Sequence, residues 1–116
     1  MSSQKFALLT LTVTATGAVS PHRFVSFAGA QLAVAGALAL GVSTFQAVAN
    51  DDLALDVIGT TVVESGAAVA VGDAIVSDAS GRGIENPAVG GEVVLGYALD
   101  AATAAGEFIE VLLVRS

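Results

Sequence analysis

The sequence contains no cysteine and no tryptophan, and it has a single histidine and a single lysine. The absence of cysteine excludes disulfide bonds, thiolate metal sites and a cysteine nucleophile. The histidine, His22, follows Pro21 in a predicted turn. One histidine without cysteine is a poor basis for a metal centre or a catalytic triad, so we interpret His22 as a surface or interface residue.

Positive charge is also scarce. Lys5, Arg23, Arg82 and Arg115 face eleven acidic residues, which gives a net charge of −7. Nucleic-acid binding needs a cationic surface, so we predict no nucleic-acid partner. A domain that carries biotin or lipoate would suit the size of the chain, but it needs a lysine on a hairpin, and Lys5 lies in the N-terminal segment.

Motifs for catalysis are missing as well. There is no G-x-S-x-G nucleophile elbow, and Gly81-Arg82-Gly83 does not continue into a phosphate-binding loop. Asp51 and Asp52 are adjacent and would point to opposite sides of an extended chain. Asp73 and Asp78 flank a predicted strand and suit turns, and no EF-hand loop is present. We predict no enzyme and no cofactor, and we assign no catalytic, cofactor-binding or metal-binding residue.

What the chain does contain is small apolar residues. Hydrophobic residues make up 54% of its 116 residues, charged residues 13%, and the mean hydropathy is +0.80. A chain of this length buries roughly two-thirds of its unfolded surface in one core. Because this composition offers more apolar surface than a monomer readily buries, we predict self-association.

Alternation of polar and apolar residues predicts strands along most of the chain. Thr10, Thr12 and Thr14 alternate with leucine and valine, which is typical of a strand and not of the uniform apolar stretch of a signal peptide. We predict strands at 6–15, 23–27, 32–34, 39–42, 53–58, 60–63, 74–77, 93–98 and 107–114. Residues 44–50 are predicted as loop or a helical turn, residues 82–87 as irregular, and residues 100–105 as the best candidate for a short helix.

These patterns predict an all-β fold, a small barrel or sandwich of short strands with at most one short helix. Residues 1–5 are predicted to be a flexible N-terminal arm, and residues 6–116 a single β domain. The clearest local signal is Asp78-Ala79-Ser80-Gly81. Aspartate first and glycine fourth favour a type I turn with a left-handed glycine, which should close a hairpin or end a strand.

Three short matches suggest an internal repeat. Residues 40–42 (LGV) resemble 95–97 (LGY), residues 18–19 resemble 68–69, and Asp56-Val57 resembles Glu110-Val111. The offsets are 55, 50 and 54 positions. They favour two pseudo-repeated β-units, although a sequence rich in alanine and valine also gives such matches by chance.

One stretch leaves an alternative open. Residues 24–50 carry no charge over 27 positions, which is long enough for a membrane helix of about 20 residues. Gly29, Gly36 and Gly41 interrupt the stretch, and the flanking aromatic and basic anchors of a membrane span are missing. Short strands with glycine turns are the preferred interpretation, with a small membrane protein as the alternative.

Residues 71–82 (VGDAIVSDASGR), 91–102 (GEVVLGYALDAA) and 105–113 (AGEFIEVLL) follow one another in an order that resembles a known family. Their "GD" before a strand, D-x-x-G turn, "GxAL" strand and closing "aGExxEVLL" strand resemble the small capsid cement (head decoration) proteins of tailed bacteriophages. The match spans most of the chain.

The resemblance implies a β-rich homotrimer on the outside of the phage head, where it binds the major capsid protein and stabilises the shell after expansion. It implies no catalytic residue. On this interpretation Glu107 and Glu110 are edge or solvent charges, and Val111 to Val114 form core or trimer contacts. A tail or fibre-base module of the virion and a small-ligand β-barrel remain as further alternatives.

Overall fold

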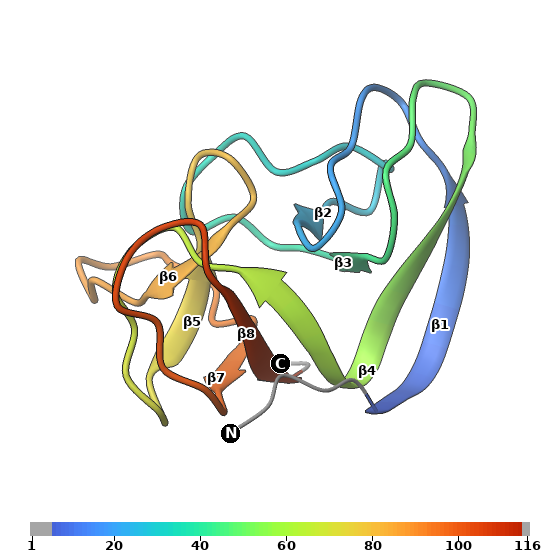
Figure 1. Ribbon diagram of the computed structural model, residues 1–116. Helices are drawn as coiled ribbons and strands as arrows, with labels where there is room; N and C mark the ends of the chain where they lie inside the picture. The colour runs from blue at the N-terminus through green and yellow to red at the C-terminus, as the bar shows by residue number, and fades with distance from the viewer. Residues whose placement is uncertain (1–5, 115–116) are drawn as a thin grey trace.

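The computed structural model describes residues 6–114, and these form eight strands and no helix (Figure 1). The strands are β1 (Phe6–Thr14), β2 (Phe24–Val25), β3 (Gly41–Ser43), β4 (Asp52–Glu64), β5 (Ala74–Ser77), β6 (Gly83–Glu85), β7 (Gly96–Ala98) and β8 (Phe108–Leu113). Their order in the sheet is β2-β3-β4-β8-β7-β5-β6, and β1 pairs with β4. The named strand pairs are all antiparallel.

The sheet curls into a nearly closed barrel, in which the chain after β5 returns towards β2. The backbone N–H of Phe24 donates to the carbonyl of Gly81 at 2.7 Å. At the same side of the barrel, Ser65 forms a parallel bridge to Gly83 in β6. The sequence predicted an all-β fold, either a small barrel or a sandwich, and the all-β prediction is confirmed, with the barrel as the form that it takes.

Strand β4 is the longest element and crosses the whole molecule (Figure 1). Its first half pairs with β1 and β3, and its second half pairs with β8. The sequence predicted two strands separated at Gly59. The structure instead has one strand, in which Gly59 adopts a φ of 103°. A glycine tolerates this conformation, and the pairing with β1 shifts its register beside it.

The predicted repeat is confirmed by the strand pairing. In the first half of the chain, Thr14 of β1 pairs with Asp52 of β4. The residue 50 positions after Thr14 is Glu64, the residue 56 positions after Asp52 is Phe108, and these two also pair. The same offsets hold for the neighbouring pairs of β1·β4 and β4·β8. The pairing of β2 with β3 is likewise repeated by the pairing of β5 with β7. The offset is 50 residues from β2 to β5 and 55 residues from β3 to β7. We call residues 6–57 the first unit and residues 60–113 the second unit.

The proposed sequence matches are right in two cases of three. Residues 40–42 correspond to 95–97, and residues 18–19 correspond to 68–69. The third match is wrong by two positions, because Asp56 corresponds to Leu112 and not to Glu110. The connection from β7 to β8 is one residue longer than that from β3 to β4, so the offset rises from 55 to 56.

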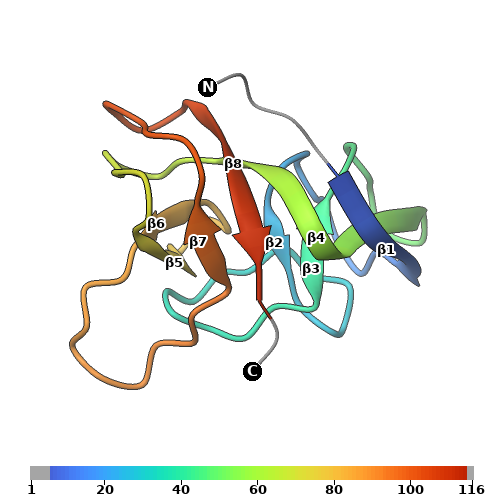
Figure 2. The same cartoon turned by 90° about the horizontal axis from the view of Figure 1, so that it is seen from below.

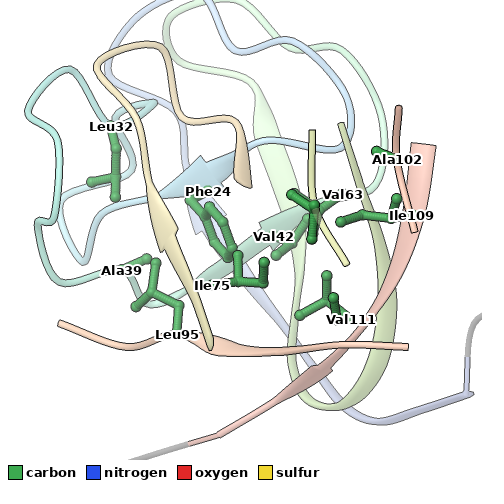
Figure 3. Packing of buried hydrophobic residues seen from close by; sticks show 12 residues of the cluster. Phe24, Leu32, Ala39, Val42, Val63, Ile75, Leu95, Ala102, Ile109 and Val111 are labelled. Carbon is green, nitrogen blue, oxygen red and sulfur yellow. The ribbon is translucent and has the colours of Figure 1, made fainter. Parts of the chain in front are cut away.

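Each unit has its own apolar core. The cluster of the first unit consists of Ala15, Val19, Val25, Ala47, Leu53, Leu55 and Val57. The larger cluster contains second-unit residues such as Val69, Ile75, Ala102, Ile109 and Val111, together with Phe24, Leu32, Ala39 and Val42 of the first unit (Figure 3). Each large side chain that is fully buried contributes about 1.5–3 kcal/mol to stability. The first unit thus packs part of its own side chains into the core of the second.

The uncharged stretch 24–50 is part of this β fold. It contains β2, β3 and the loops around them, and within residues 6–114 no helix is long and apolar enough to cross a membrane. The strand predicted at residues 32–34 is wrong. Only Gln31 forms an isolated bridge, to Val25, because Gly29 and Gly36 turn the chain with φ values of 85° and 77°.

Other elements also differ from the prediction: the strand predicted at 23–27 shortens to β2, and that predicted at 39–42 is β3. Residues 100–105 form no helix: Ala102 bridges to Val69, and Asp100 accepts a hydrogen bond from the backbone N–H of Glu110 at 3.0 Å instead of capping a helix. Residues 82–87 are not irregular throughout, because β6 lies within them. The strand predicted at 93–98 shortens to β7.

The D-x-x-G turn is confirmed and joins β5 to β6. Asp78 Oδ1 accepts hydrogen bonds from the N–H groups of Ser80 and Arg82 at 2.8 and 2.9 Å. Gly81 has a φ of 78°. The side chain of Asp78 thus stabilises the turn, and the left-handed glycine lets the chain reverse into β6.

Candidate functional surfaces

Apolar side chains on two sheet faces are the main exposed feature of the described residues. Many large hydrophobic residues are exposed, and half of those in the described chain lie singly in loops, which is normal for a folded protein. Ile58 in β4 and Phe108 in β8 are also exposed, and two groups on strands contain more than one such side chain. The first is on β1, with Leu8, Leu9 and Leu11, and the second is on β7 and β8, with Tyr97 and Leu112.

Strand β1 is an edge strand among the described elements, since it pairs only with β4. Its register shifts between Ala7 and Leu9, which leaves Leu8 out of the pairing, and the Leu8 side chain is 80% exposed. Edge strands with apolar side chains are templates for association with another chain. The sequence signalled this strand through its threonine alternation, but it gave no sign that the apolar side is also exposed.

The second group is a cross-strand pair. Tyr97 in β7 lies directly opposite Leu112 in β8, and their side chains are 44% and 42% exposed. Gly96 and Ala98, which flank Tyr97, are buried. One face of this part of the sheet therefore packs on the core, while the other presents an aromatic and an aliphatic side chain to the outside.

An ion-pair network joins the two units. Arg23, just before β2, donates through Nε and Nη2 to Glu64 Oε1 at 3.3 and 3.1 Å and through Nη1 to the carbonyl of Ser80 at 2.8 Å. Arg82 Nε lies 3.2 Å from Asp78 Oδ2, and its Nη1 lies 3.9 Å from Glu64. The two arginines of the described residues are thus both engaged with carboxylates, so the rest of this surface is acidic or uncharged.

Of the four aspartates considered as candidate ligands, Asp52 begins β4, and the other three accept hydrogen bonds within turns. Asp51 Oδ2 accepts from the N–H of Val48 at 3.1 Å, and Asp73 Oδ2 accepts from the N–H of Ala70 at 2.9 Å. His22 is partly buried and packs edge-on against Phe108, with ring centroids 5.2 Å apart. Within residues 6–114 no three carboxylate or histidine side chains gather at one point.

The two glutamates of the closing segment differ from each other. Glu110 is buried, with 6% exposure, so its predicted role as an edge or solvent charge is wrong. The reason is that β8 lies between β4 and β7 and is not an edge strand. Glu107 precedes β8 and accepts hydrogen bonds from Thr103 Oγ1 and N at 2.6 and 3.1 Å, which lower the pKa of its carboxyl group.

Hollows on the surface are small. One of about 240 Å³ lies beside the loop before β7 and is lined by residues that include Val76, Ile84, Pro87 and Val89. Its volume is below the range of roughly 300–1,000 Å³ that small-molecule pockets occupy.

Comparison with solved structures supports the fold. The chain superimposes on the crystal structure of the head fiber gp8.5 N base of bacteriophage phi29 with a TM-score of 0.75. The match covers 93% of this chain and 95% of that chain, at 18% sequence identity. At this identity the likeness establishes a shared fold. A search of curated protein sequences found no match.

Comparison with protein families is decisive for function. Residues 3–113, nearly the whole chain, match the family model described as "Phage cement protein". Such a protein is a structural component of the virion on the surface of the capsid, and this match is what confirms the predicted location and the prediction that the protein is not an enzyme. The chain belongs to the phage cement protein family.

Proposed function

We propose that this cement protein acts as a homotrimer that binds the major capsid protein on the outside of the expanded head and holds neighbouring capsomers together. The single observation that carries the proposal is the family match over residues 3–113. The exposed apolar faces on β1 and on β7 and β8 support it, since contiguous apolar surface marks contact with other proteins.

Charge and copy number fit the same role. The eleven acidic residues all lie within residues 6–114, which contain only Arg23 and Arg82 as basic residues. A protein on the outer surface of the shell has no need to contact DNA, and excess negative charge favours solubility. Many copies on one shell would reinforce one another, because each bound copy raises the effective concentration of the next contact.

The test uses expanded heads that lack the protein. Purified protein is added, unbound protein is removed by sedimentation, and the heads are then heated or moved to low salt. We expect saturable binding and a higher temperature of DNA release for decorated heads. Unexpanded heads are the control and should bind less. Failure of the purified protein to bind expanded heads would overturn the proposed function.

The trimer has a separate test. The chain has a mass of 11.4 kDa, and light scattering after size-exclusion chromatography should give three times this value. A monomeric mass at the highest soluble concentration would contradict the trimer, while head binding would remain a valid test of the capsid contact.

A second candidate function is the capsid-attached base of a head fibre. The likeness to the phi29 head fiber base favours it. An electron cryo-microscopy map of the virion separates the two candidates. A cement protein gives compact density about the size of residues 6–114, whereas a fibre base carries a projection that continues away from the shell.

A further inference from the structure

Equivalent strands of the two units are covered to different extents. All residues of β3, Gly41–Ser43, are buried, so this strand is covered on both of its faces. Strand β7 occupies the same place in the second unit. There Gly96 and Ala98 are buried, whereas Tyr97, the equivalent of Val42, is exposed. The second unit therefore has an uncovered face that is covered in the first.

In the first unit, the face of β3 that carries Val42 is covered by the second unit of the same chain. Phe24 and Val42 are cross-strand partners, and both lie in one cluster with Val63 of the second unit (Figure 3). Asp56 continues the same row of paired residues, and its Oδ2 accepts a hydrogen bond from Thr61 Oγ1 at 2.8 Å. We call the row of Phe24, Val42 and Asp56 the leading face, and the surface around Thr61 and Val63 that covers it the receiving face.

Each face has an equivalent elsewhere in the chain. The offset of 50 places Leu11 and Val13 of β1 where the second unit has Thr61 and Val63. Thr61 is 2% exposed and Val63 is fully buried, whereas Leu11 is 39% exposed and Val13 is partly buried. Val13 packs in part against the core of its own unit, so the receiving face of the first unit is left exposed at Leu11.

The equivalent of the leading face is the row of Ala74, Tyr97 and Leu112. Tyr97 and Leu112 are the exposed pair on β7 and β8. Strands β1 and β7 lie on opposite sides of β4, as the view from below shows (Figure 2). The chain thus presents an uncovered leading face on one side and an uncovered receiving face on the other.

The side chains at these positions are complementary in kind. Inside the chain, the contact between the two faces is a polar pair, Asp56 with Thr61. Their equivalents are Leu112 and Leu11, which form an apolar pair. An aromatic ring is also retained in each leading face, in β2 as Phe24 and in β7 as Tyr97. Both members of this one pair are therefore apolar where their equivalents are polar, which suits a direct contact between them.

We propose that a second copy of this chain docks head-to-tail on the first. Its β1 residues Leu9, Leu11 and Val13 cover Tyr97 and Leu112 of the first copy in the way that the second unit covers the first. Such a contact joins two different surfaces, and it closes into a ring if the rotation between copies permits. The inference rests on the proposed self-association and names the surfaces that make it; three chains would place six units in one ring.

Cysteine cross-linking tests the direction of the contact, since the natural chain has no cysteine. Leu11→Cys and Leu112→Cys are prepared as separate variants. Under mild oxidation a mixture of the two should give a covalent dimer, while neither variant alone should give one. The double variant should give a closed covalent oligomer. The head-to-tail arrangement would be overturned if either single variant cross-linked with itself. It would also be overturned if the mixture of the two variants gave no covalent dimer.

Substitution tests the paired residues. Leu112→Asp should reduce the mass in light scattering to the 11.4 kDa of the monomer, because the new carboxylate would face Leu11 with no donor. Adding Leu11→Thr should restore association, because it recreates the hydrogen-bonded pair of Asp56 and Thr61. Val89→Asp, at a loop position that is 84% exposed, is the matched control and should leave the mass unchanged.

The outcomes also separate this inference from the proposed function. If Leu112→Asp leaves the mass unchanged but abolishes binding to heads, the capsid protein and not a second copy covers this face, and the inference is wrong. If it leaves both unchanged, the inference is wrong while the cement function stands. If the wild-type protein is oligomeric but does not bind heads, the proposed capsid contact is wrong, while the head-to-tail interface between copies is still supported.

Discussion

Gly41 and Gly96 occupy the same position in the two units, and each lies against a backbone carbonyl of the neighbouring strand. A Cβ atom at Gly41 would lie 2.5 Å from the carbonyl oxygen of Asp56, and one at Gly96 would lie 2.5 Å from that of Leu112. Real contacts of a Cβ atom are longer, so neither position accepts a side chain without a shift of the sheet. The close approach of these strands is thus a shared requirement of both units.

We expect Gly41→Ala and Gly96→Ala each to lower the free energy of unfolding by about 1–3 kcal/mol, the usual cost of overpacking. Urea unfolding followed by circular dichroism measures the change. Gly17→Ala is the control, because a Cβ there has nothing within 4 Å. A loss at Gly17 as large as those at Gly41 and Gly96 would show that close packing is not the reason.

Asp56 links three strand segments and should be important for stability. Its Oδ1 accepts from Thr10 Oγ1 at 3.1 Å, its Oδ2 accepts from Thr61 Oγ1 at 2.8 Å, and its side chain is buried. Asp56→Ala leaves these hydroxyl groups without this acceptor, so we expect a loss of about 1–3 kcal/mol. Asp52→Ala, at an exposed position of the same strand, should change stability by less than about 0.5 kcal/mol. Equal losses in thermal or urea unfolding would contradict this role of Asp56.

Glu107 should make stability depend on pH in the acidic range. Hydrogen bonds from the side chain and the backbone of Thr103 lower the pKa of its carboxyl group in the folded state. Its contribution is therefore fully present above the pKa of the unfolded chain, and it is lost as the pH falls through the lower pKa of the folded state. Glu107→Gln should be less stable than the wild type at pH 7, and the difference should vanish at strongly acidic pH.

Urea unfolding at both pH values measures this difference, and Thr103→Val, which removes the hydroxyl donor but keeps the backbone N–H, should reproduce part of it. Because the carboxylate is exposed to solvent, the difference should also shrink at high salt. A difference between the wild type and Glu107→Gln that is the same at both pH values would show that the ionised carboxylate is not responsible.

The sequence predicted those elements whose signals are local. The threonine alternation of residues 6–15 predicted β1, and Asp78 with Gly81 predicted the turn between β5 and β6, because both depend on neighbouring residues alone. The repeat was also visible, since the glycine of each LG pair is required by close backbone approach in both units. Gly59 misled the prediction, because a glycine that ends a strand and one that bends a long strand look alike in sequence.

The candidate surfaces could not be predicted in the same way. Val42 and Tyr97 hold equivalent positions, yet one is fully buried and the other is 44% exposed. This difference arises only when the first unit packs on the second, which is a tertiary event without a local signal. The burial of Glu110 has a similar origin, because only the strand order shows that β8 lies between β4 and β7. The family resemblance supplied the function that these patterns alone did not.

Residues 1–5 precede β1, and their predicted role as a flexible arm lies outside the described residues. We propose that this arm assists docking on the capsid, since a segment beside an edge strand suits strand addition to a partner. Deletion of residues 2–5 should weaken head binding while the melting temperature stays unchanged, because β1 is retained. A variant with the segment replaced by glycine and serine of equal length separates sequence from length. Equal losses of binding and melting temperature would count against a docking arm.

Arg23 and Glu64 connect the two units through an ion pair whose side chains are only 16% and 19% exposed. Arg82 lies farther from the same carboxylate, at 3.9 Å, and is more exposed. A double-mutant cycle with Arg23→Met and Glu64→Gln should therefore give a coupling energy of about 1 kcal/mol, at the upper end for partly exposed pairs. The matched cycle with Arg82→Met should give a smaller value, and both should fall at high salt. If the two coupling energies were equal, the ion pair of Arg23 would have no special part in holding the first unit against the second, and the apolar contacts of Phe24 and Val42 would account for that junction.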